Sequence, residues 1–183
     1  MRRVFALLAP LILLSSGHLM AATTGHPGAL PLGKFGGWEA AYFSDQGNKV
    51  CYMALAPSST ASNKPVKGRD PNVLFFVTHW PADNQKDAVT ISTGYPYKPG
   101  SKAIVLIGNE SYAMSTGGPG TGADSNMAWI DESAVEEKLV AALRAADTMT
   151  VKGTSKRGTM ITDTYTLTGS AEAYNAISKA CGL

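Results

Sequence analysis

Histidine and cysteine side chains could do chemistry in this chain, and there are few of them. Three histidines and two cysteines occur among 183 residues. His18 lies in an apolar N-terminal segment and His26 in a stretch rich in glycine and proline, so only His79 lies in a well-patterned region. A histidine-based zinc site needs several convergent ligands, which one histidine cannot supply. We interpret His79 as a hydrogen-bonded structural residue at a strand end, and we expect no metal and no cofactor.

The sequence motifs of covalent catalysis and of phosphate binding do not occur. No GxSxG elbow and no SxxK pair can be found, and the glycine-rich run at residues 117–122 is not followed by the lysine of a P-loop. The aspartates also lack the 1-3-5 spacing of a calcium loop. We therefore predict that the protein is not an enzyme. The alternative is a hydrolase in which His79 acts with a neighbouring carboxylate.

The two cysteines, Cys51 and Cys181, predict one disulfide bond. Their separation excludes a CxxC redox pair, and an exported chain of this size commonly carries a single bridge. Such a bridge would close a loop of about 130 residues, worth roughly 5 kcal/mol in the chain-entropy view. Two buried thiols are the alternative.

The N-terminus has the composition of a secretory signal peptide. Arg2 and Arg3 precede an apolar run at residues 4–14, and the small pair Ala21-Ala22 follows. We assign residues 1–22 to the signal peptide, with a membrane anchor as the alternative. We therefore expect an exported protein without a transmembrane segment after cleavage, located in the periplasm, at the outer membrane or outside the cell.

Net charge argues against a nucleic-acid partner. Without Arg2 and Arg3, the 16 − 2 = 14 remaining basic residues balance 14 acidic ones, so no general basic field remains. Two short basic clusters occur, and we interpret them as ordinary solvated surface. They consist of Lys64, Lys67 and Arg69, and of Lys152, Lys156 and Arg157.

The pattern along the chain predicts a single, mainly β domain. Residues 23–34 are rich in glycine and proline and are expected to be a flexible lead-in to a domain over residues 35–183. Short β-branched and aromatic runs separated by turn residues predict a β-sandwich, and residues 57–71 are expected to be an exposed loop. Helical spacing appears only near the C-terminal end, at residues 132–146 and 170–180. The predicted strands lie at residues 38–43, 49–54, 73–80, 89–93, 103–107 and 110–114, and in a hairpin over 148–167.

An aromatic corner provides the candidate partner-binding surface. Tyr95 and Tyr97 alternate with prolines, and tyrosine is enriched at protein interfaces. With the neighbouring Lys98, and with Lys156 and Arg157 in the turn of the last hairpin, they form the surface that we predict for a partner. The alternative is that both rings cap the core of the sandwich.

Several stretches together resemble one family, the invasion-associated locus B proteins. Their order and spacing cover nearly the whole chain after the leader. They are Gly36-Gly37-Trp38, Val50-Cys51-Tyr52, Phe76-Val77-Thr78-His79, Gly94-Tyr95-Pro96-Tyr97-Lys98-Pro99-Gly100, Val151-Lys152-Gly153-Thr154-Ser155-Lys156-Arg157-Gly158-Thr159, Thr162-Asp163-Thr164-Tyr165 and Lys179-Ala180-Cys181.

This resemblance implies an immunoglobulin-like β-sandwich exported to the envelope, in a family linked to the entry of a bacterium into host cells. It implies no enzymatic activity and supplies no catalytic residues. We expect a non-catalytic protein that binds an unknown protein or envelope component. A small periplasmic chaperone or inhibitor is a further alternative, and the residues do not indicate an oligomeric state.

Overall fold

The computed structural model describes residues 25–118 and 120–183, which form eleven strands, two α-helices and one short 3-10 helix. The predicted signal peptide, residues 1–22, lies outside the described residues. The strands are β1 (Leu30–Phe35), β2 (Trp38–Asp45), β3 (Asn48–Leu55), β4 (Ser59–Ser62), β5 (Leu74–Trp80), β6 (Gln85–Ser92), β7 (Ala103–Ile107), β8 (Glu110–Thr116), β9 (Met127–Trp129), β10 (Thr148–Thr154) and β11 (Met160–Thr166). The helices are η1 (Pro81–Asp83), α1 (Ser133–Ala145) and α2 (Ser170–Cys181).

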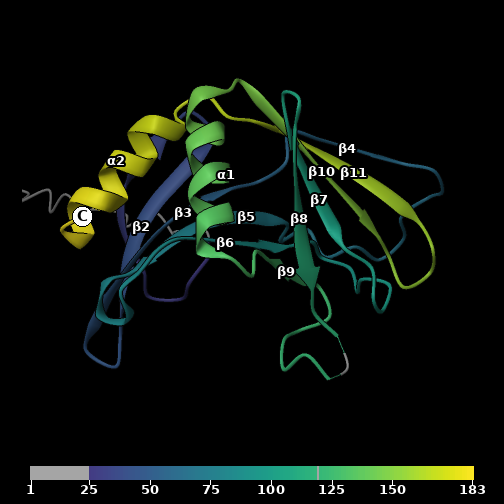
Figure 1. The fold of residues 1–183 in the computed structure, drawn as a ribbon, viewed down its shortest axis with the longest axis horizontal. Coiled ribbons are helices and arrows are strands. Elements are labelled where there is room, and N and C mark those ends of the chain that lie inside the picture. The colour runs from purple at the N-terminus through teal and green to yellow at the C-terminus, as the bar shows by residue number, and fades with distance from the viewer. Residues whose placement is uncertain (1–24, 119) are drawn as a thin grey trace, which may run out of the picture.

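All the strands join one antiparallel sheet that bends into two layers. Its order is β1-β2-β3-β5-β6-β9-β8-β7-β10-β11-β4. Phe75 on β5 and Tyr165 on β11 are far apart in that order, yet their ring centroids lie 6.1 Å apart. The sheet must therefore fold back so that β11 faces β5 (Figure 1). Two facing antiparallel layers are the predicted sandwich arrangement.

Both helices cover the part of the first layer that the second layer leaves open (Figure 1). The α2 helix packs on β1, β2 and β3, and α1 packs on β6. Their ends fall within one or two residues of the predicted bounds, which confirms a mainly β fold with two helices near the C-terminus. No helix in the described ranges has the length and apolar character needed to cross a membrane.

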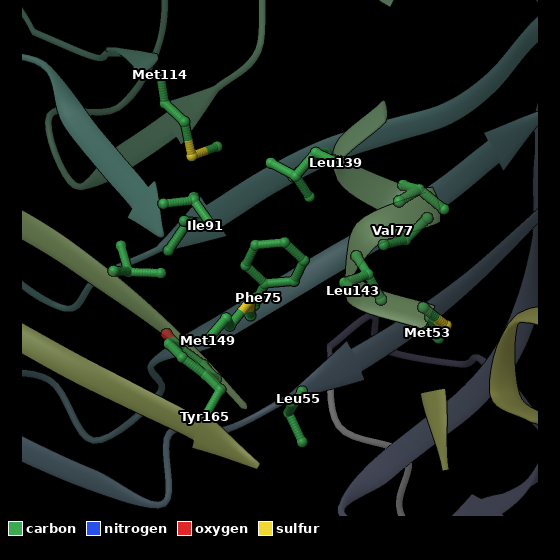
Figure 2. Close-up of a cluster of buried hydrophobic side chains, with 14 of the residues drawn as sticks. Met53, Leu55, Phe75, Val77, Ile91, Met114, Leu139, Leu143, Met149 and Tyr165 are labelled. Atoms are coloured by element: carbon green, nitrogen blue, oxygen red, sulfur yellow. The ribbon is translucent and has the colours of Figure 1, made fainter. Parts of the chain in front are cut away.

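One large hydrophobic core fills the space between the layers and α1. Figure 2 shows side chains from β3, β5 and β6 meeting Tyr165 and Met149 of the opposite layer and Leu139 and Leu143 of α1. Phe75, Leu139 and Tyr165 are fully buried. Strand alternation places one set of residues inward, which explains why the β-branched and aromatic runs were readable as strands.

The prediction of a flexible lead-in over residues 23–34 is wrong for its second half. β1 occupies Leu30–Phe35 and pairs with β2, although it contains Pro31 and Gly33. Its pairing register shifts between these two residues, and β1 is the first strand of the sheet. A proline lacks an N–H donor, but on an edge strand no neighbour requires that donor.

The exposed loop predicted at residues 57–71 also contains a strand. β4 spans Ser59–Ser62, and all four of its residues are exposed. It lies at the other edge of the sheet, where it pairs with β11. With no buried face, β4 has no hydrophobic pattern that would have revealed it.

The predicted disulfide is confirmed. Cys51 on β3 and Cys181 at the end of α2 are bonded, with a Cα–Cα distance of 6.0 Å and a sequence separation of 130. Cys51 is completely buried. The bond therefore attaches the last turn of the last helix to a central strand of the first layer.

We predict that Cys51→Ser and Cys181→Ser each lower the free energy of unfolding by about 2–5 kcal/mol, because each restores the entropy of a long open loop to the unfolded chain. The double variant should cost little more than either single change, since one bond is lost in all three. Chemical denaturation with and without reductant measures this. Equal midpoints for the wild-type chain in both conditions would contradict it.

Candidate functional site

Two of the predicted partner-binding residues, Tyr95 and Tyr97, are buried, and the other three are exposed. Tyr95 is 7% exposed and Tyr97 is 2% exposed, so both rings belong to the core. The prediction that the rings face a partner is therefore wrong for Tyr97, whereas Tyr95 also lines a surface cavity. They pack where Gly153 leaves room: a Cβ atom there would lie 2.4 Å from Tyr95 Oη and 2.8 Å from Tyr97 Cε1. Lys98, by contrast, is exposed.

Backbone hydrogen bonds join this aromatic corner to the turn of the last hairpin. The Lys98 N–H donates to the Thr154 carbonyl over 2.9 Å, and the Lys156 N–H donates to the Pro96 carbonyl over 2.8 Å. Two of the stretches that carry the family resemblance therefore pack against each other. Their tyrosines and glycine serve that packing, whereas the side chains of Lys156 and Arg157 stay exposed on the surface.

His79 is buried in a hydrogen-bond network that fixes its tautomer. Its Nδ1 accepts the backbone N–H of Asp87 over 3.2 Å, and its Nε2 lies 3.2 Å from Ser178 Oγ. Because Nδ1 is the acceptor, the neutral ring carries its proton on Nε2 and donates it to Ser178. A general base for a serine needs the opposite arrangement, with an unprotonated nitrogen facing the hydroxyl.

The carboxylate beside His79 is also engaged elsewhere. Asp87 Oδ1 lies 3.8 Å from His79 Nδ1, beyond hydrogen-bond distance, and accepts the hydroxyl of Tyr174 over 2.8 Å. His79, Asp87, Tyr174 and Ser178 thus connect β5 and β6 to α2. This resembles a serine, histidine and aspartate set in composition, but its hydrogen bonds do not activate the serine.

A second buried polar group lies at the opposite end of the domain. Arg69 donates to both carboxylate oxygens of Asp163, over 2.8 and 2.6 Å, and its Nε–H donates to the Thr93 carbonyl over 2.8 Å. Its side chain is 12% exposed and that of Asp163 is 2% exposed, so this is a largely desolvated, bidentate ion pair. Thr60 of β4 also donates to Asp163 over 2.6 Å. We call these bonds the Arg69 clasp.

A cavity of about 260 Å³ opens beside the Arg69 clasp. One wall is the segment at residues 65–69, and the other is the hairpin turn with Lys156 and Arg157. Four basic residues and no acidic residue line it, so it joins members of the two basic clusters that lie far apart in the sequence. The basic residues are Lys67, Arg69, Lys156 and Arg157.

This basic cavity is the feature that the sequence analysis missed, because each cluster alone had the appearance of solvated surface. The clue available in the sequence was that Lys156 and Arg157 occupy a tight hairpin turn. A concave surface with cations of one sign concentrates anions. Chemically, the cavity is therefore suited to binding a negatively charged group.

We predict that Arg69→Gln lowers the free energy of unfolding by about 3–5 kcal/mol, because it leaves the buried Asp163 carboxylate without its cation. Arg157→Gln, which removes the same charge from an exposed side chain, should change it by less than about 0.5 kcal/mol. Denaturant unfolding of both variants is the measurement. Similar losses in the two would show that the ion pair does not stabilise the fold.

We also predict a pH dependence from His79. Burial lowers the pKa of His79 below its ordinary value of 6.5, so below that pH the unfolded chain binds more protons than the folded one. Stability should therefore fall as the pH drops through 6.5. Burial also raises the pKa of Glu136 above its ordinary value of 4.5, and this makes the folded chain more stable as the pH falls. Glu136 is present in both the wild type and His79→Gln, so the difference between their pH curves reports on His79. Urea unfolding from pH 5.5 to 7.5 should show a weaker decline in the variant, and parallel curves would contradict this.

Comparisons with known proteins agree on one family. A family model described as "Invasion associated locus B (IalB) protein" matches residues 38–178, well over half of the chain. No curated protein sequence matches. The crystal structure of invasion associated protein B from Bartonella henselae is similar, with a TM-score of 0.54 and 16% identity, over 82% of this chain and 96% of that one. At that identity the structural likeness concerns the fold, while the family match covers the sequence itself: this chain belongs to the invasion associated locus B family.

Proposed function

We propose that this protein is an exported, non-catalytic envelope protein that binds an anionic partner through the basic cavity. The cavity carries the proposal, because it is concave, lined by four basic residues and free of acidic ones. The family is described as invasion associated, and contact between the cell surface and a host is the corresponding setting.

Two features support export. The first 22 residues have the charged, apolar and small-residue order of a secretory leader. The Cys51–Cys181 bond fits an oxidising compartment, because disulfides in reducing cytosol are rare.

The burial and hydrogen bonding of His79 support a non-catalytic role. The ring is completely buried, and both of its nitrogens have partners. A base that must exchange protons with a substrate needs access to that substrate. A hydrolase built on His79 would need α2 to move away from β5.

A chaperone or inhibitor is less well supported, because binding of unfolded chains needs a continuous exposed apolar surface. Within residues 25–118 and 120–183, the large exposed hydrophobic residues are Leu30, Met160 and Leu183. They belong to β1, β11 and the C-terminus, so they do not form one patch.

The proposal predicts processing, export and partner contact at the cavity. A photo-crosslinking residue replaces Arg157 at the cavity rim, and a second one replaces the exposed Lys138 on α1 as the matched control. We expect the mature protein in the periplasmic or envelope fraction, and adducts with an envelope component at position 157 but not at 138. An unprocessed cytoplasmic chain, or equal adduct patterns at both positions, would overturn it.

A further inference from the structure

We propose that the basic cavity binds a phosphate group, carried by a small phosphorylated molecule or by a lipid head group. The inference rests on the proposed function, because it names the chemical class of ligand for the same cavity. It follows from how the charges are compensated, which donors face the cavity and how large the cavity is.

The first step is that three of the four cations have no counter-charge. Asp163 neutralises Arg69 through two hydrogen bonds. The ion pairs of the described chain involve Lys34, Arg69 and His79, so Lys67, Lys156 and Arg157 are in none of them. A site with three unpaired cations therefore lies around one small opening.

The nearest acidic side chain along the chain does not change this balance. Asp70 follows Arg69, but its carboxylate accepts the backbone N–H of Asn72 over 2.8 Å, and Asp70 does not line the cavity. The described part of the chain is formally neutral, with 14 basic and 14 acidic residues. The positive charge at the cavity therefore comes from a local excess of basic residues, because the described chain is neutral as a whole. A cleft lined by one sign of charge focuses its field on a bound anion.

The second step is the hydroxyl groups of the cavity. Ser155 and Thr159 line it together with Lys156 and Arg157. Ser155 Oγ accepts the Thr159 N–H over 3.2 Å, so its own O–H hydrogen is left to donate to another acceptor. Lysine, arginine and hydroxyl donors around one point match the terminal oxygens of a phosphate, which accept several charge-assisted hydrogen bonds.

The third step is size. A volume of about 260 Å³ lies just under the range of roughly 300–1,000 Å³ typical of pockets for drug-sized ligands. It suits a phosphate with one small attached group. Val66, Pro96 and Ile161 line the same cavity and would contact the uncharged part of the ligand. An extended polyanion would instead need a long basic groove, and Lys152 lines a second depression that shares only Ile161 with this cavity.

The test uses the mature, disulfide-bonded chain labelled with ¹⁵N, at constant ionic strength. Its amide spectrum is followed during titration with inorganic phosphate, glucose 6-phosphate and, as the uncharged control, glucose. Both phosphates should shift the amides of residues 66–69, of Tyr95 and of residues 155–161, and glucose should shift none of them.

Two double variants separate the cavity from general charge. Lys156→Gln with Arg157→Gln removes two rim cations, and Lys138→Gln with Lys179→Gln removes two exposed cations from the helices. The first pair should weaken phosphate binding about tenfold or more, since each lost charge-assisted bond contributes substantially. The second pair should leave the binding constant unchanged within error. Equal weakening by both pairs would overturn the proposal.

Vesicles then distinguish the two sources of the phosphate. Sedimentation with phosphatidylcholine vesicles, with and without phosphatidic acid, tests a lipid head group. Binding that needs phosphatidic acid and is lost in the rim variant assigns the site to lipid, whereas shifts with glucose 6-phosphate alone assign it to a soluble ester. No localised shift and no vesicle binding would overturn the inference.

The outcomes also distinguish this inference from the proposed function. Crosslinking to an envelope component at position 157 without any phosphate binding would overturn the ligand class alone. Phosphate binding by a chain that stays in the cytoplasm would overturn the proposed function alone.

Discussion

The eleven-stranded sheet bends into two layers without any hydrogen bonding between its edge strands β1 and β4, so other interactions must hold the layers together. The hydrophobic core does this at one place, where Phe75 of β5 meets Tyr165 of β11, whereas the disulfide fixes α2 to the first layer. The Arg69 clasp joins the two layers at another place. The Arg69 guanidinium donates to Thr93, just after β6 in the first layer, and to Asp163 and Thr60, on β11 and β4 in the second. A buried ion pair contributes more to geometry than to stability, because desolvation offsets much of its attraction.

The Arg69 clasp also determines where the basic cavity forms. It holds the segment at residues 65–69 beside β11, so Lys67 is brought close to the turn that carries Lys156 and Arg157. The aromatic corner supports the other wall, because Pro96 and Lys98 are hydrogen bonded to the hairpin. Among the residues that line the cavity, Tyr95, Ser155, Thr159 and Ile161 are buried, while Lys67, Lys156 and Arg157 are exposed. Repulsion among exposed cations is small enough for the fold to tolerate.

The sequence allowed most elements with an inward face to be predicted. The hairpins β2–β3, β7–β8 and β10–β11 and both helices have a local hydrophobic period and clear turn residues. The edge strands could not be predicted in this way. β1 contains Pro31 and Gly33, and β4 is entirely exposed, so each is a strand only because a neighbouring strand offers hydrogen bonds. Tyr97 was misassigned because an aromatic corner between prolines has the same composition at an interface and at the end of a core.

The sequence near the basic cavity does not show which of its cations are paired with an acidic residue. Arg69 and Lys67 are neighbours in one basic cluster, yet Arg69 is paired with a buried carboxylate 94 positions away and Lys67 is not. The fold thus divides the cations into those that stabilise it and those that it leaves uncompensated. Only the pairing of β4 with β11 and the course of the 65–69 segment reveal which is which. Uncompensated cations scattered over a surface would be ordinary, but these lie around one hollow with hydroxyl donors inside it, and that arrangement is what a bound anion requires.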